Sequence, residues 1–196
     1  MKQFIIKLKS ATATLHKNLE ASVLSKKIMS LEVNKTDYSN YLHASLQMHS
    51  DVEWHVFPII ANVIKDSSVR KKAFLIAKDI ELLEIYSKPN HTFIDDQYNK
   101  QLNFNLGIMY VTEGSTLGGL YICKNLQQVI EPNIPQTFLT AYGEQTGKRW
   151  SDFLKMLEDH LITLDDVQKD EIIAGAVYAF GRTQELFNND FYKNGI

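Results

Sequence analysis

One long apolar stretch near the middle of the chain constrains the fold more than any other feature. Residues 105–129 have a largely apolar helical pattern, yet glycine interrupts it at Gly114, Gly118 and Gly119. Three glycines inside a helix cost about 3 kcal/mol relative to alanine, which is a large share of the net stability of a small domain. Because these glycines fall on neighbouring faces of the helix, they predict one side-chain-free strip. We expect either a close helix crossing or a flat ligand against that strip.

Helical patterns also occupy most of the remaining chain, and no sustained two-residue alternation predicts a strand. Pro58 should break or kink the helix that precedes it. We expect an all-α protein with a single domain over residues 1–196. Besides the central stretch, the expected helices cover residues 3–21, 23–30, 36–57, 67 or 68 to just before 89, 136–142, 148–161, and 163 or 165 to 188, with Thr36 as a helix cap and a loop at 87–95.

Composition excludes several classes of function. The chain has 21 basic and 23 acidic residues, so it lacks the basic excess that nucleic-acid binding requires. Its single cysteine, Cys123, cannot form an internal disulfide, which suits a reducing cytoplasm. No apolar run reaches the roughly 18 residues of a membrane span, and the N-terminal residues lack the features of a signal peptide. We therefore expect a cytoplasmic protein that binds neither nucleic acid nor membranes.

The first predicted helix carries a polar stripe beside an apolar one. The apolar stripe, which we expect to pack on the core, consists of Ile5, Leu8, Thr12, Leu15 and Leu19. The polar stripe consists of Lys9, Ala13, His16 and Glu20, which lie within about 40° of one another on an ideal helix. Glu20 can bind one nitrogen of His16 and leave the other free as a ligand. One imidazole is too few ligands for a bare zinc or non-haem iron site. It is enough for haem, whose porphyrin supplies four nitrogens, and Lys9 is placed to pair with an anionic group of the same ligand.

Three motifs resemble those of haem oxygenases, in particular the bacterial, biliverdin-producing branch associated with bacteriophytochromes. The first is similar to the helix that ligates haem iron, the second to the distal helix, and the third to a further signature of that branch. In order, they are LKSATATLHKNLE at 8–20, YVTEGSTLGG at 110–119 and FLTAYGEQTGKRWSDF at 138–153. Phe180 and Phe187, seven residues apart, resemble the aromatic residues of the pocket wall. The resemblance spans nearly the whole chain in the expected order.

The resemblance implies a helical bundle with haem sandwiched between the first helix and the glycine-kinked distal helix. It implies that O2 and electrons from a separate ferredoxin or reductase convert haem to biliverdin, ferrous iron and CO. A bilin-binding phytochrome is one candidate recipient of the product. His16 would ligate the iron and Glu20 would orient it. The residues implied to cover the distal face of haem are Gly114, Ser115, Gly118 and Gly119.

Some positions depart from the family pattern. Ser115 aligns with the distal carboxylate of relatives, so it can hold a water through its hydroxyl but cannot supply a charge. Leu120 stands where relatives often carry a polar or basic residue. Ala13 stands where some relatives carry a second lysine for a haem propionate. Lys9 is the first candidate for the propionates, and the weaker candidates are Tyr110, Lys148 and Arg149.

Two other classes of function remain open. A non-enzymatic haem carrier or sensor on the same scaffold would also bind haem, and only turnover distinguishes it from the enzyme. A di-iron helical-bundle oxygenase would need carboxylate–histidine pairs from several helices. The pairs within residues 49–55 point in different directions, which argues against that class. We interpret the remaining histidines as surface or core polar residues; they are His43, His49, His55, His91 and His160.

Overall fold

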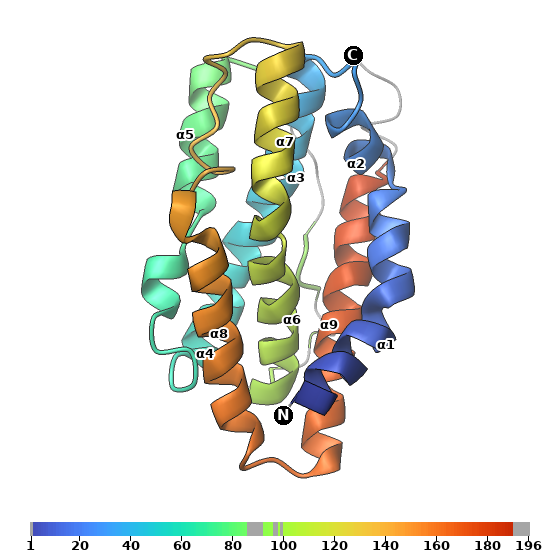
Figure 1. The fold of residues 1–196 in the computed structure, drawn as a ribbon, viewed down its shortest axis with the longest axis vertical. Coiled ribbons are helices and arrows are strands. Elements are labelled where there is room, and N and C mark those ends of the chain that lie inside the picture. Colours follow the sequence, from blue (N-terminus) through green and yellow to red (C-terminus); the bar gives the residue numbers. More distant parts are fainter. Residues whose placement is uncertain (1, 86–91, 96–97, 99, 190–196) are drawn as a thin grey trace.

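The computed structural model describes residues 2–85, 92–95, 98 and 100–189. Helices dominate this part of the chain and no strand occurs in it, which confirms the predicted all-α class (Figure 1). The elements are α1 (Lys2–Glu20), α2 (Val23–Ile28), α3 (Lys35–Asp51), the π-helical η1 (Val52–Val56), α4 (Phe57–Ile60), the 3-10 helix η2 (Ser67–Arg70), α5 (Ala73–Leu83), α6 (Leu102–Gly114), α7 (Thr116–Val129), the 3-10 helix η3 (Gly143–Gln145), α8 (Thr146–Leu161) and α9 (Asp166–Phe187).

Helix α9 crosses α6 at very short range. A Cβ atom added to Gly107 of α6 would lie 2.0 Å from the carbonyl oxygen of Ile172, and one added to Gly175 would lie 1.8 Å from that of Phe104. Only glycine allows two helix backbones to approach so closely. Helix α9 also packs along α1, so it holds α1 and α6 on its surface (Figure 1).

Pro58 does not end the helical path, so the predicted break is wrong, and a π-helical turn precedes the proline instead. The helical path runs from α3 through the π-helical turn η1 into α4, which ends at Ile60. In η1 the N–H of Phe57 bonds to the carbonyl of Val52, five residues back. Pro58 then falls in the first turn of α4, where its missing N–H leaves no helical bond unmade. The π-helical turn therefore lets the chain continue through the proline.

Other predicted elements differ at their ends. Residues 67–83 form η2 and α5 rather than one helix, and residues 137–142 form successive turns instead of a helix. Helix α5 ends at Leu83, and the next residue, Glu84, adopts a left-handed conformation with φ of 55°. The predicted helix end before Pro89 and residues 87–91 of the predicted loop lie outside the described residues.

Capping boxes fix the starts of α3 and α9. Asp165 accepts a hydrogen bond from the N–H of Gln168 (2.8 Å), and the Gln168 side chain accepts one from Asp165 (3.0 Å). Asp165 is one of the two caps expected there. For α3, the expected cap Thr36 is wrong, because Asn34 accepts the N–H of Asp37 at 3.0 Å and α3 begins at the next residue.

None of the helices in the described ranges is both long and apolar enough to cross a bilayer.

Candidate functional site

The central stretch predicted as one helix is broken at Ser115. Helix α6 ends at Gly114 and α7 starts at Thr116. The N–H of Ser115 still bonds four residues back, to Val111 (3.0 Å), whereas the N–H of Gly118 bonds only three residues back, to Ser115 (3.1 Å). The hydroxyls of Ser115 and Thr116 each donate at 2.7 Å to carbonyls in the last turn of α6. Side-chain bonds thus satisfy carbonyls that the interrupted helix leaves unpaired.

The three glycines near this break face different surroundings. A Cβ on Gly119 would lie 2.7 Å from the carbonyl oxygen of Leu139, so this glycine allows a close approach of two backbones. A Cβ on Gly114 would touch the ring of Trp150 at 3.5 Å, an ordinary contact distance. A Cβ on Gly118 would meet nothing within 4 Å, and this residue is exposed. The glycines therefore do not form the single bare strip that the sequence pattern predicted.

His16 lies on the exposed stripe of α1 and contacts α9. Its side chain is 61% exposed, and its Nδ1 atom lies 3.4 Å from a carboxylate oxygen of Glu20. The imidazole packs edge-on against Phe180 of α9, with ring centroids 5.8 Å apart. Phe187, two turns further along α9, is buried against Tyr41 of α3 (5.6 Å). The structure thus brings together His16, Glu20 and Phe180, while Nε2 of His16 remains available on the exposed side chain.

The propionate candidates are divided between two parts of the molecule. Lys9 is exposed on α1, the helix of His16. Tyr110 is buried against Trp150 of α8, with ring centroids 5.4 Å apart. Arg149 pairs with Asp66 at 3.4 Å, and Lys148 pairs at 2.6 Å with a carboxylate one turn along α8. The last three candidates are therefore engaged on the α8 side of α6 rather than on α1.

A buried cluster of charged residues lies at the end of α6, and the sequence pattern did not predict it. Arg70, Lys72 and Glu113 are almost completely buried. Glu113 accepts hydrogen bonds from Arg70, from Nζ of Lys72 (3.3 Å) and from the hydroxyl of Tyr142 (3.2 Å). Lys72 also donates to the Tyr142 hydroxyl at 2.8 Å. We call these four residues the Glu113 cluster.

Burial and neighbouring charges shift the pKa values of the three donors in the Glu113 cluster. Burial lowers the pKa of Lys72, although Glu113 opposes this shift. Burial also favours a lower pKa for Arg70, but hydrogen bonding to Asp66 and the charge of Glu113 outweigh it, so the pKa of Arg70 is raised. Burial and the charge of Glu113 both raise the pKa of Tyr142, which keeps its hydroxyl protonated as a donor. The buried carboxylate of Glu113 thus receives hydrogen bonds from three donors.

The third sequence motif supplies the support for the break between α6 and α7. Tyr142 belongs to the Glu113 cluster, and Trp150 fills the space beside Gly114. Phe153 stacks on Trp150 (5.6 Å) and lies under the guanidinium of Arg70 (6.0 Å). These aromatic residues of the motif lie on the buried side of α6.

His49 is a core histidine with an unpaired ring nitrogen. Its Nε2 atom is buried without a hydrogen-bond partner, and its ring packs against Phe138 with centroids 5.3 Å apart. Burial, with a contribution from the nearby charge of Lys72, holds the pKa of His49 well below its usual value. His49 is therefore neutral, which confirms its interpretation as a core polar residue.

The carboxylates near His49 serve structural roles. Asp51 accepts the N–H groups of Phe93 (2.7 Å) and Ile94 (3.0 Å), and Glu53 accepts those of Lys72 and Ala73 at the start of α5. Within the described ranges, no three His, Cys, Asp or Glu side chains gather so that they could hold a metal ion. This part of the chain offers no ligand set for a di-iron centre. Of the other histidines, His55 is exposed, His43 and His160 are partly buried, and His91 lies outside the described residues.

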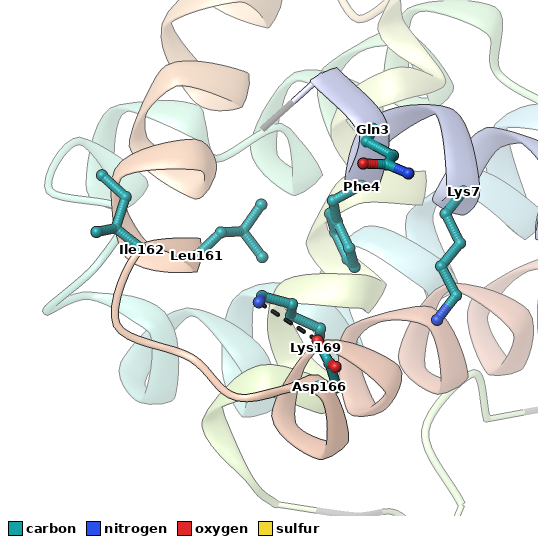
Figure 2. A pocket seen from close by; sticks show the side chains of 7 residues that line it. All are labelled: Gln3, Phe4, Lys7, Leu161, Ile162, Asp166 and Lys169. Carbon is teal, nitrogen blue, oxygen red and sulfur yellow. Dashed lines mark ion pairs between the residues drawn. The ribbon is translucent and has the colours of Figure 1, made fainter.

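A cavity of about 540 Å³ opens at the other end of α1. Figure 2 shows it between the start of α1, the end of α8 and the start of α9. The residues that line it are Gln3, Phe4, Lys7, Leu161, Ile162, Asp166 and Lys169. It includes none of the predicted haem-site residues.

The arrangement of α1, α6, α7 and α9 occurs in other proteins of known structure. A heme oxygenase from Leptospira interrogans superposes with a TM-score of 0.75 at 17% identity, covering 94% of this chain and 98% of the other. The NO- and CO-bound heme oxygenase from Neisseria meningitidis superposes with a TM-score of 0.76 at 21% identity, covering 97% and 92%. No curated protein sequence matches this chain. The fold is therefore that of these two heme oxygenases.

The family follows from the sequence itself. The profile of the family described as Heme oxygenase matches residues 2–189, and the chain belongs to that family. The predicted membership of the haem oxygenase family, the fold class and the enzyme activity are thus confirmed, whereas the association with bacteriophytochromes stays a prediction: the protein is an oxidoreductase that degrades haem. The carrier or sensor and the di-iron oxygenase gain no support from these comparisons.

Proposed function

We propose that this enzyme converts haem to biliverdin, ferrous iron and CO, using O2 and electrons from an external donor. His16 is proposed as the axial iron ligand. The observation that carries this assignment is the imidazole itself: it is largely exposed, directed by Glu20 at one nitrogen, and placed edge-on against Phe180. Bound haem supplies the iron at which O2 is reduced. The whole chain acts as one haem-oxygenase unit in this proposal.

On the α1 side, Glu20 sets the tautomer of His16. Because Nδ1 of His16 lies 3.4 Å from the Glu20 carboxylate, Nδ1 carries the proton and Nε2 keeps its lone pair for the iron. Phe180 limits rotation of the imidazole from the α9 side. Lys9, exposed on the same helix, is proposed to pair with a propionate.

On the distal side, the α6–α7 break is proposed to lie over the haem face. Gly118 adds no side chain to this surface, so a planar ring can approach the backbone there. The Ser115 hydroxyl is exposed and donates to the Thr112 carbonyl. Its oxygen lone pairs can therefore accept a hydrogen bond from a water, which is how it would help to order a proton source. Gly114 and Gly119 are assigned to the same distal wall, with their own contacts on its buried side.

The remaining assignments are broader. Tyr110, Lys148 and Arg149 are retained as weaker propionate candidates, and Phe187 as part of the pocket wall. A ferredoxin or a reductase is proposed as the electron donor. A bilin-binding phytochrome is proposed as one recipient of the product in the cytoplasm.

The test is a titration of the purified protein with hemin, followed by ascorbate or a ferredoxin–reductase pair in air. We expect a stoichiometric Soret band that decays to a broad bilin absorption while CO is released. A Soret band that persists under reductant would instead indicate a carrier or sensor.

The axial ligand is tested separately. His16→Ala should remove the histidine-ligated spectrum and turnover. His55→Ala is the matched control, because His55 is also exposed but lies on η1, and it should leave both unchanged. Retention of the wild-type spectrum in His16→Ala would assign the iron to another residue.

A further inference from the structure

The Glu113 cluster buries charged groups, and the stability of the fold alone does not explain why they are there. Glu113 is buried in the last turn of α6, where the negative end of the helix dipole disfavours a carboxylate. A buried carboxylate is strongly unfavourable unless donors surround it. This chain meets that need with three donors, the buried Arg70 and Lys72 and the partly buried Tyr142. An apolar residue could fill this position without needing any of these donors.

The donors come from segments that are distant in sequence. Arg70 and Lys72 flank the junction of η2 and α5, and Tyr142 precedes η3. Further bonds hold these segments in turn: Arg70 bonds to Asp66 (2.8 and 2.9 Å) and Lys72 donates to the carbonyl of Arg70 (3.0 Å). Glu113 is therefore fixed by a rigid network rather than by one flexible side chain.

The position of Glu113 relative to the break determines what this network can control. Ser115, two residues later, is rotated by about 200° around the helix and is exposed where Glu113 is buried. The Glu113 side chain therefore points away from the surface assigned to haem. It can affect that surface only through the backbone, whose carbonyl at Glu113 also accepts the Thr116 hydroxyl (2.7 Å).

From this geometry we propose that Glu113 is a positioning residue that fixes the height and tilt of the α6–α7 break over the haem face, with Arg70, Lys72 and Tyr142 as its anchor. The proposal rests on the proposed haem site. In this proposal, the cluster controls how a distal ligand is oriented and which edge of the haem ring is attacked. The affinity for haem depends instead on His16, which belongs to α1.

The test uses two variants of the cluster and one matched control. Glu113→Gln removes the charge, and Tyr142→Phe removes one donor while keeping the ring. Glu171→Gln is the control, because Glu171 also accepts a hydrogen bond from α6, at 2.9 Å from Asn103, but at the opposite end of that helix. Thermal unfolding and circular dichroism establish that each variant is folded.

In the haem-loaded protein, we expect the dissociation constant for haem to stay within about threefold of wild type for both variants. The C–O stretching frequency of the CO complex should shift and the mixture of biliverdin isomers should broaden. Turnover should fall by about ten- to a hundredfold in Glu113→Gln, because small misplacements of reacting groups have effects of that size. Tyr142→Phe should change each quantity in the same direction but less, and Glu171→Gln should change none.

A second readout needs no haem. In the apoprotein, hydrogen exchange at the amides of residues 115–119 should accelerate in Glu113→Gln and Tyr142→Phe but not in Glu171→Gln. This measurement decides whether the cluster anchors the α6–α7 break even if the wild type fails to bind haem, an outcome that would instead remove the proposed function. If Glu113→Gln does not fold, Tyr142→Phe carries the test. Folded variants with wild-type exchange at 115–119, or with an unchanged CO frequency and isomer mixture, would overturn the proposal and leave the cluster a stabilising role.

Discussion

Replacing Gly175 with alanine should separate α6 from α9 and destabilise the protein. The added Cβ would lie 1.8 Å from the carbonyl oxygen of Phe104, and an ordinary contact begins at 3.4 Å. The two backbones must therefore shift by the difference, 3.4 − 1.8 = 1.6 Å. Overpacking of a core costs about 1–3 kcal/mol, and occasionally more. Because the obstacle is backbone rather than a mobile side chain, we expect the upper end of that range.

Alanine also improves the helix, by about 1 kcal/mol relative to glycine. The net loss for Gly175→Ala is then about 2 kcal/mol. Gly181→Ala is the matched control on the same helix, because a Cβ there meets nothing within 4 Å. This control should gain up to about 1 kcal/mol. The two variants should therefore differ by about 3 kcal/mol, or about 6–12 °C in Tm for a chain of this length.

In the assay, the apoprotein is unfolded by heat and by urea, and circular dichroism monitors the unfolding. Measuring without haem keeps any effect of Gly181 on the nearby Phe180 out of the comparison. Equal midpoints for the two variants would refute the close crossing of α6 and α9 described above. A large loss in both would mean that the surroundings of Gly181 are more crowded than the structure shows.

Three further predictions concern single positions. Gly118→Leu should weaken haem binding in a Soret titration with unchanged helicity, whereas Gly147→Leu, equally open at the start of α8, should not. The free energy of unfolding of the wild type should fall by up to about 1.4 kcal/mol per pH unit below 6.5, because His49 takes up a proton in the unfolded chain but stays neutral when buried. In His49→Leu, the free energy measured by urea unfolding should depend less on pH. Glu84→Gly should raise the unfolding free energy by about 0.5–1 kcal/mol, since φ is 55°, whereas Glu81→Gly inside α5 should lower it.

The sequence predicted best those features that depend on one helix alone. The spacing of Ile5, Leu8 and Thr12 identified the face of α1 that the structure buries. The i, i+4 relation of His16 and Glu20 predicted their contact, because a helix brings such residues together whatever surrounds it. Helix ends were predicted less well, since the cap of α3 depends on side-chain bonds that several nearby residues could have made.

Features that depend on tertiary contacts could not be predicted from the sequence. Glu113 was visible as a carboxylate inside an apolar helix, but Arg70 and Lys72 are 43 and 41 residues away, and no local pattern links them. The closest helix crossing uses Gly107 and Gly175, whereas the sequence pattern drew attention to the glycines near Ser115. Those were predicted as one strip because the helix was treated as unbroken. The turn at Ser115 changes their directions, and an ideal helical wheel cannot show that.

The two sides of the proposed haem site are held in different ways, and this has a consequence for variants. Helix α6 is fixed by backbone contact with α9 at Gly175 and by the Glu113 cluster at its end. Helix α1 packs on α9 through its apolar face and leaves the stripe with His16 exposed. A change at His16 removes a ligand without disturbing the distal wall. A change at Glu113 moves the distal wall and leaves the ligand in place. Haem affinity and product distribution should therefore respond to separate sets of substitutions.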